Sequence, residues 1–249
     1  MQVGHSPAII FAYDAATGSE VWASHYLGPA SDEGNFDLTI SPDDTHVFVT
    51  GGGQSNAADV TTQSYATGAT TPPPVSLLGA TSTKIHGAAG TFDLDLPLSG
   101  TPGVECRSSG ANNEHTIVFN FARPLTSVAT ARVTSGNGSV KNSTIDSDDA
   151  HKYVVHLTGV SNGQVITVTL ANVYDSAGNS SQTVSVSMAV LLGDVTGNRI
   201  VSNTDVATVK AQVAATVTAS NFLNDINING VISNTDVSLT KAEVGTQLP

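Results

Sequence analysis

The sequence GDVTGNRIVSNTD occupies Gly193–Asp205, and a closely related sequence, DININGVISNTD, occupies Asp225–Asp236. The first acidic residues of the two copies and their last acidic residues are both 31 residues apart (225 − 194 and 236 − 205). A helix-like run follows each copy, at 206–215 and at 237–244. A repeat at a fixed separation indicates a duplicated structural unit.

Each copy has the residue pattern of an EF-hand-type calcium loop, in which ligands stand at positions 1, 3, 5, 7, 9 and 12 and a glycine at position 6 makes a sharp turn. Calcium prefers hard oxygen ligands, so carboxylates, amides, hydroxyls and a main-chain carbonyl suit it. The sequence therefore predicts two calcium sites. The predicted ligands are Asp194, Thr196, Asn198, the Ile200 carbonyl, Ser202 and Asp205 in the first loop, and Asp225, Asn227, Asn229, the Val231 carbonyl, Ser233 and Asp236 in the second.

The first loop departs from this pattern in two places. Thr196 is a weak ligand, and Arg199 stands at the sixth position, where the turn requires a positive φ that glycine adopts most easily. The second loop has Gly230 at that position. We therefore expect the second site to bind calcium more strongly, and both affinities to be modest because each loop has only two carboxylates. The alternative interpretation is a pair of Asx-rich turns without metal.

Residues 191–249 resemble the type I dockerin family, which has two such loops, ends each loop with Asp, and has a helix after each loop but none before the first. The resemblance implies a small helical domain that binds a cohesin. In dockerins the tenth and eleventh loop positions and basic residues of the following helix form the binding surface. The corresponding residues here are Asn203, Thr204 and Lys210 in the first copy and Asn234, Thr235 and Lys241 in the second.

The composition limits the possible functions. Charged residues make up 12%, and the net charge of −12 leaves only nine Lys and Arg, which argues against a nucleic-acid-binding surface. No apolar run is long enough to span a membrane. The single cysteine, Cys106, excludes an internal disulfide and is expected to be a buried strand residue. Calcium loops and Ser/Thr-rich strands indicate an extracellular or cell-surface protein, either after removal of its export signal or as a piece of a longer product.

Residues 1–71 predict four short strands, at 8–13, 20–23, 36–40 and 46–50. Tyr13–Gly18, Trp22 and 41–51 resemble the repeat of quinoprotein-type bacterial β-propellers, which implies a sheet like one propeller blade. A second, degraded repeat begins at 65–68. One blade cannot close a propeller, so this segment should pack against something else. We interpret Trp22 as a packing residue; the alternative is a cofactor platform.

The prolines at 72–74 indicate a linker, assigned to 72–83, and residues 84–190 predict an Ig-like β-sandwich. Its turn clusters separate short apolar or alternating runs, as in sandwich folds. The segment 168–179 resembles bacterial Ig-like modules, which end in a D-x-x-G-N turn before the last strand. The predicted strands lie at 91–96, 116–121, 129–133, 153–157, 165–170 and 184–188.

Other acidic and histidine residues give weaker signals. Asp93 and Asp95 alternate with apolar residues and should share the solvated face of a strand. A second acidic group, Asp146, Asp148 and Asp149, could hold a cation but lacks a ligand spacing. His151 and His156 should face opposite sides of a strand. No G-x-S-x-G elbow, H-E-x-x-H pair or P-loop is present, although glycosidase carboxylates would leave no short motif. The predicted Ig-like module is small for a polysaccharide cleft, so we expect a protein that is not an enzyme.

The predicted fold is mainly β, with an N-terminal propeller-blade-like sheet (1–71), a Pro-rich linker (72–83), an Ig-like β-sandwich (84–190) and a small α-helical dockerin-like domain (191–249). We expect a non-catalytic extracellular assembly protein whose calcium-loaded repeats bind a protein partner. That partner is either another copy, giving a homo-oligomer, polymer or filament, or a cohesin-like domain. The alternatives are the C-terminal end of a larger secreted propeller enzyme and carbohydrate binding by the sandwich, which the aromatic content of 5% disfavours.

Overall fold

The computed structural model describes residues 9–13, 17–25, 36–55, 57–67, 72–108 and 110–249. Within these residues the fold is mainly β, as the sequence predicts. The chain divides into two compact units, Met1–Pro72 and Pro73–Pro249, which we call unit 1 and unit 2. The division falls at the prolines that indicated a linker. None of the described helices has the length and apolar character needed to cross a membrane.

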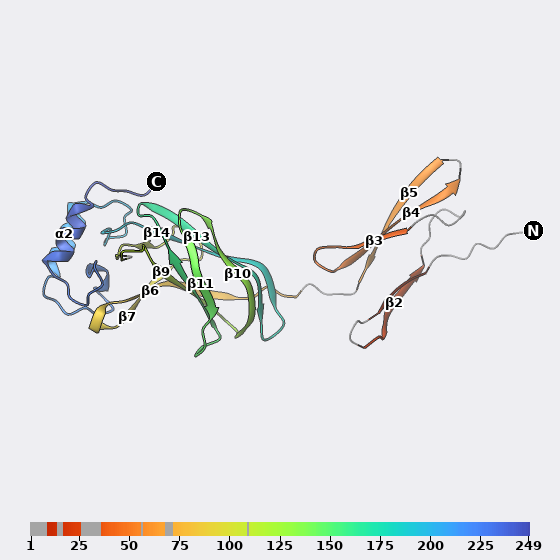
Figure 1. The fold of residues 1–249 in the computed structure, drawn as a ribbon, viewed down its shortest axis with the longest axis horizontal. Coiled ribbons are helices and arrows are strands. Elements are labelled where there is room, and N and C mark those ends of the chain that lie inside the picture. The colour runs from red at the N-terminus through yellow and green to blue at the C-terminus, as the bar shows by residue number, and fades with distance from the viewer. Residues whose placement is uncertain (1–8, 14–16, 26–35, 56, 68–71, 109) are drawn as a thin grey trace, which may run out of the picture. The chain divides into compact units, whose positions relative to one another are not determined.

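The described residues of unit 1 form two small antiparallel sheets (Figure 1). One is the hairpin of β1 (Ile9–Tyr13) and β2 (Glu20–His25). The other has the order β3-β4-β5, from β3 (Phe36–Ile40), β4 (His46–Ser55) and β5 (Ala57–Ala66).

The prediction of one four-stranded blade in unit 1 is therefore wrong, although its four strands are present. In the described residues β2 does not pair with β3, and a further strand, β5, pairs with β4 along its whole length. The sequence of β5, rich in Thr, Ser and Gln, lacks the apolar alternation that marks a strand.

Trp22 is half-buried within unit 1. Its ring stacks on Tyr65 at a centroid distance of 6.1 Å, and its Nε1 donates to the Thr67 carbonyl at 3.1 Å. A buried indole N–H needs such an acceptor. These contacts support its interpretation as a packing residue.

Unit 2 contains a two-sheet β-sandwich and the repeat pair (Figure 1). One sheet has the order β11-β12-β9-β6-β7 and the other the order β10-β13-β14-β8. All neighbours are antiparallel except β14 and β8. The strands are β6 (Leu77–Ile85), β7 (Thr91–Leu96), β8 (Val104–Glu105), β9 (His115–Phe121), β10 (Leu125–Ser135), β11 (Ser139–Ile145), β12 (Lys152–Thr158), β13 (Gln164–Asp175) and β14 (Ser180–Val190).

The sandwich core follows from alternation along its central strands. On β9, Ile117 and Phe119 are fully buried, while the residue between them is only half-buried. On β13, Ile166 and Val168 are fully buried in the same core cluster. Successive side chains of a strand point to opposite faces, so each sheet contributes one apolar face to the core. All six strands predicted in this region are present.

The predicted linker 72–83 is wrong beyond residue 76, because Leu77 begins strand β6. Strand β6 lies between β7 and β9 in its sheet, and Ala80 and Ser82 on its inner face are buried. This strand lacks a strict alternation of apolar and polar residues, so its sequence gave no clear strand signal. The strands β8 and β11 were also not predicted.

The repeat pair contains helices α1 (Asn203–Ala211) and α2 (Asn234–Ala242). Two short 3₁₀ turns accompany it: η2 (Phe222–Asn224) before the second loop, and η1 (Gly87–Ala89) between β6 and β7 of the sandwich. Both α-helices begin three residues earlier than predicted, because Ser202 and Ser233 are their N-caps. The last three residues of each loop are therefore the first turn of its helix.

The repeat pair packs against the sandwich within unit 2. Leu191, directly after β14, is fully buried in a cluster with Ala189 and Val104 of the sandwich. Val201 of the first loop and Leu248 near the C-terminus complete this cluster. The predicted boundary at residue 191 thus lies inside a continuous apolar contact.

Candidate metal centre

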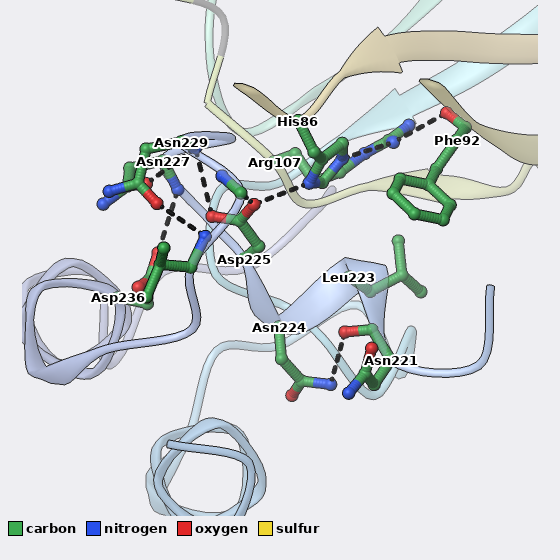
Figure 2. A network of polar contacts seen from close by, with 12 residues as sticks. His86, Phe92, Arg107, Asn221, Leu223, Asn224, Asp225, Asn227, Asn229 and Asp236 are labelled. Atoms are coloured by element: carbon green, nitrogen blue, oxygen red, sulfur yellow. Dashed lines mark hydrogen bonds and ion pairs between the residues drawn. The ribbon is translucent and has the colours of Figure 1, made fainter. Parts of the chain in front are cut away.

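The second loop is held in shape by main-chain N–H groups that donate to its two carboxylates (Figure 2). Asp225 Oδ1 accepts from Asn229 N at 3.2 Å, and its Oδ2 accepts from Gly230 N at 2.8 Å. Asp236 Oδ1 accepts from Asn227 N at 3.1 Å, and its Oδ2 accepts from Ser233 N at 2.8 Å. The chain therefore wraps around the first and last predicted ligands.

The first loop repeats these four hydrogen bonds at the same positions. Asp194 accepts from Asn198 N at 3.2 Å and from Arg199 N at 2.7 Å. Asp205 accepts from Thr196 N at 3.1 Å and from Ser202 N at 2.8 Å. The distances agree with those of the second loop within about 0.1 Å. The two loops are therefore one local structure built twice.

Both loops need left-handed backbone conformations, but they place glycine differently. In the first loop Gly197 has a φ of 69° and Arg199 a φ of 75°. At the equivalent positions of the second loop Ile228 has a φ of 54° and Gly230 a φ of 88°. Each loop thus has one glycine and one larger residue in a region that disfavours side chains. The expectation that Arg199 adopts a positive φ is confirmed.

The two repeats exchange equivalent main-chain bonds. Gly245 N donates to Val201 O, and Ala214 N donates to Ile232 O, both at 2.9 Å. Each donor stands just after one helix, and each acceptor lies in the loop of the other repeat. The helices α1 and α2 pack against each other. The repeats therefore form a single unit with approximate twofold equivalence.

The twelve predicted ligand residues are gathered in these two loops, and the loop ends are buried. Asp194, Asp205, Asp225 and Asp236 are each at most 1% exposed. Burial raises the pKa of Asp194, and the nearby charge of Asp205 adds to this effect. Burial alone would also raise the pKa of Asp205, but hydrogen bonds from Ser202 and Thr196 lower it.

This donor set fits calcium and does not fit a softer metal. In the described part of the chain no group of three or more His, Cys, Asp or Glu side chains is placed to hold a metal ion. Each loop instead combines two carboxylates with amide, hydroxyl and main-chain oxygens. Hard-cation sites are made of such oxygens, whereas zinc sites need thiolate or imidazole.

The residues predicted to contact a partner are all exposed. Asn203 and Thr204 form the first turn of α1, and Lys210 lies near its end. The same arrangement occurs on α2. Asn234, Thr235 and Lys241 are likewise exposed.

The other acidic residues are explained by local structure. Asp146 Oδ1 accepts from the main-chain N of Asp148 and Asp149, as in an Asx turn. Asp149 pairs with Lys152, whose Nζ lies 3.1 Å from its Oδ2. Among the described residues this acidic group is not placed to hold a metal ion.

Asp93 and Asp95 are exposed on one face of β7, as predicted, beside an open groove of about 600 Å³. Their apolar neighbours face the other way. Cys106 follows β8 and is completely buried, and burial raises the pKa of its thiol. His156 lies on β12, whereas His151 precedes that strand and contacts Asp149.

The sequence did not indicate a buried polar network that joins the sandwich to the second loop (Figure 2). Its members are Glu105 and Arg107, beside the end of β8, and His86, at the end of β6. His86 Nδ1 lies 2.8 Å from Asp225 Oδ2, the first predicted ligand of the second loop. The charged residues flanking Cys106 were the only available signal, and nothing in the sequence linked them to His86.

Comparison with known proteins gave no match. No protein-family model, no curated protein and no solved structure is significantly similar to this chain.

Proposed function

We propose that this chain is a non-catalytic extracellular structural protein in which a calcium-loaded, dockerin-like repeat pair joins protein molecules. The Ig-like sandwich acts as a spacer in this proposal. The observation that carries it is the agreement between the two loops: four equivalent main-chain bonds to equivalent carboxylates, 31 residues apart. Asx-rich turns that served only to reverse the chain would have no need of the same twelve-residue oxygen pattern twice.

The residues of each loop have distinct roles in this proposal. Bound calcium would neutralise the two buried carboxylates, whose mutual repulsion otherwise opposes the closed loop. Main-chain amides hold those carboxylates in place, and Ser202 and Ser233 cap the helices that follow. Each helix then presents its exposed Asn-Thr pair and its lysine toward a partner.

We propose that the partner is another copy of the chain. In unit 1 large apolar side chains are exposed, including Phe11 (48%), Leu38 (55%) and Ile40 (53%). Within the described residues β3 and β5 are the edge strands of their sheet. Exposed apolar side chains and open strand edges favour association with another chain. Contact between different surfaces of successive copies builds a filament unless the ring closes.

A cohesin-like domain is the second candidate partner, with this chain as the anchoring end of a larger secreted propeller enzyme. The exposed residues of α1 and α2, presented twice in equivalent positions, favour this candidate. It predicts a calcium-loaded chain that stays monomeric but binds a separate cohesin domain. The self-association proposal instead predicts that the mass of the calcium-loaded chain rises above that of a monomer.

The metal sites are tested by calorimetric titration of the full chain with calcium after chelation. We expect two binding events, and none with magnesium at equal concentration. The Asp225→Ala variant should lose the tighter event, and Asp93→Ala, which removes an exposed carboxylate outside the loops, should keep both. Titration without heat or helical change in the unsubstituted chain would exclude a calcium site.

Association is tested by sedimentation at increasing protein concentration, with calcium or with chelator. We expect the mass to rise with concentration only when calcium is present. The double variant Thr235→Arg/Lys241→Glu changes two exposed residues of the predicted binding surface. It should reduce association without changing calcium affinity. A chain that binds two calcium ions and remains monomeric at high concentration would rule out self-assembly.

A further inference from the structure

The two loops differ in what surrounds them, although their internal bonds agree. Asp225 accepts a hydrogen bond from a buried side chain of the sandwich, His86. In the described residues, the hydrogen bonds to Asp194 all come from its own loop. The first loop meets the sandwich through other contacts: Val201 packs in the apolar cluster with Val104 and Ala189, and Gly193 N donates to Cys106 O at 2.9 Å. Its Arg199 O accepts from Leu248 N of the C-terminal segment at 3.0 Å. The first loop therefore serves, within the same chain, as a control for the effect of the His86 contact on the second loop.

Arg107 is held firmly in place within the buried polar network that contacts the second loop. It is 1% exposed, and Glu105 holds it through an Nε–Oε1 contact of 2.8 Å and an Nη2–Oε2 contact of 2.7 Å. Two of its three remaining N–H groups donate to the main-chain carbonyls of Ser82 and Phe92, at 2.9 and 3.0 Å, and the third faces His86. A fully bonded, planar guanidinium has one orientation.

This orientation determines the tautomer of His86. Arg107 Nη1 lies 3.1 Å from His86 Nε2 and can only donate, so Nε2 accepts. The imidazole proton then lies on Nδ1 and is donated to Asp225 Oδ2 at 2.8 Å. Together with Gly230 N, this donor fixes the rotation of the carboxylate at the first ligand position. His86 is therefore a positioning residue for Asp225.

The second loop also touches the sandwich through its backbone. A Cβ at Gly87 would lie 2.2 Å from Asn229 O, and a Cβ at Gly230 would lie 2.7 Å from His86 O. Ser108 N donates to Ile226 O at 2.7 Å. Such close contact leaves the loop little freedom to change shape without moving off the sandwich.

Two aromatic contacts also join the second loop to the sandwich. Phe222, just before the loop, stacks on Phe92 of β7 with a centroid distance of 5.4 Å. The Arg107 guanidinium lies 5.0 Å from the centre of the Phe222 ring. The loop, the ring before it and the guanidinium thus form one buried contact surface.

We propose that calcium in the second loop, and not in the first, holds the repeat pair rigidly against the sandwich, with His86 transmitting the coupling. The inference rests on the proposed calcium function. Ordering of Asp225 by the ion favours the docked loop, and by reciprocity the docked His86 favours ion binding. The second loop is then a calcium-dependent joint between spacer and binding module.

The test uses two substitutions of similar size at His86. In His86→Asn the side-chain amide nitrogen stands where Nδ1 donates to Asp225, whereas in His86→Gln it stands near Nε2, facing Arg107. Calcium affinity is measured by calorimetry in the full chain with only one loop intact, using Asp205→Asn or Asp236→Asn. Loss of an outer-shell partner costs about 10- to 100-fold in metal affinity.

With only the second loop intact, we expect His86→Gln to weaken calcium binding at least about tenfold and His86→Asn by less than about threefold. With only the first loop intact, neither substitution should change the affinity. Calcium should also slow hydrogen exchange at the Ser108 amide in Asp205→Asn but not in Asp236→Asn.

The outcomes separate this inference from the proposed function. Two results would overturn the inference alone. One is a second loop that binds calcium equally well with His86 and with His86→Gln. The other is equal calcium-dependent protection of the Ser108 amide in Asp205→Asn and in Asp236→Asn. A failure of the unsubstituted chain to bind calcium would overturn the proposed function and the inference with it.

Discussion

Arg199 and Ile228 both occupy left-handed backbone conformations, with φ values of 75° and 54°. For a residue with a Cβ this region costs about 1–2 kcal/mol. The strain is local, because the turn of each loop needs these conformations to direct main-chain N–H groups at the first carboxylate. Glycine relieves it at only one of the two positions in each loop.

Substitution Arg199→Gly should therefore stabilise unit 2 by about 1 kcal/mol. The measurement is urea unfolding in the presence of chelator, so that metal binding does not contribute. The matched control is Gly197→Ala, where the added Cβ would meet nothing within 4 Å and only the strain of a φ of 69° is introduced. It should destabilise by a similar amount. A stability loss in Arg199→Gly would show that the arginine side chain makes a compensating contact.

His115 is buried in the sandwich, and among the described residues neither ring nitrogen has a hydrogen-bond partner. Burial, with the positive charge of Lys84, lowers the pKa of His115 from 6.5 to about 3. The folded chain thus keeps the imidazole neutral at pH values where the unfolded chain protonates it. Stability is then full above pH 6.5 and falls as the pH drops from there toward 3.

Between pH 7 and pH 5 this difference should cost about 2 kcal/mol of unfolding free energy. The His115→Leu variant lacks the titrating group, so its stability should change less over the same interval. Urea unfolding of both chains at the two pH values measures the effect. An identical pH slope in the variant would assign the acid sensitivity to other groups.

At the scale of elements, each helix of the repeat pair depends on its N-cap. Ser202 and Ser233 accept from the main chain of the first turn, while Asp205 and Asp236 accept from the N-cap amides, completing capping boxes. The same four side chains are predicted calcium ligands. In the proposed calcium-bound state the metal would use other lone pairs of these oxygens than the capping bonds do, and the helix start is already defined by the loop.

Substitution Ser233→Ala should cost about 1 kcal/mol of stability in chelator, because it removes a cap acceptor. The control lies in the same helix: Ser238, whose Oγ donates to Asn234 O at 2.9 Å, is exposed in the helix interior. Since alanine has the higher helix propensity, Ser238→Ala should be neutral or slightly stabilising. Both stabilities are measured by urea denaturation. Equal losses of unfolding free energy in the two variants would argue against a specific role of the cap.

The elements that sequence patterns missed share a physical cause. Strands β5 and β6 do not alternate apolar and polar residues strictly, and they are strands because they pair with neighbouring strands through main-chain bonds. Strand pairing of this kind is decided by tertiary context more than by intrinsic propensity. By contrast, β9 and β13 alternate apolar and polar residues, and their prediction succeeded.

At the scale of the whole molecule, the chain divides at Pro72/Pro73, and unit 2 contains both the sandwich and the repeat pair. Their shared apolar cluster around Leu191 makes these two parts one folding unit. We expect residues 73–249, expressed alone, to unfold in a single transition. Its midpoint should lie within about 2 °C of that of the same unit in the full chain.

Thermal circular dichroism in calcium and in chelator measures that midpoint. Two separate transitions in the fragment would show that the repeat pair folds independently of the sandwich. The same experiment on Gly87→Ala, where a new Cβ would meet Asn229 O, should lower the midpoint most in calcium.

The sequence by itself determined the two oxygen-rich loops, their common separation and the mainly-β character of the chain, because each depends on residues close together along the chain. It could not determine that His86 meets Asp225, since 139 residues separate them. That contact exists only because β6, β8 and the second loop are brought together by packing. The sequence already distinguished the loops by Arg199 and Gly230, but tertiary structure alone gave them different surroundings, because burial of Arg107 and His86 requires polar partners and the second loop supplies one.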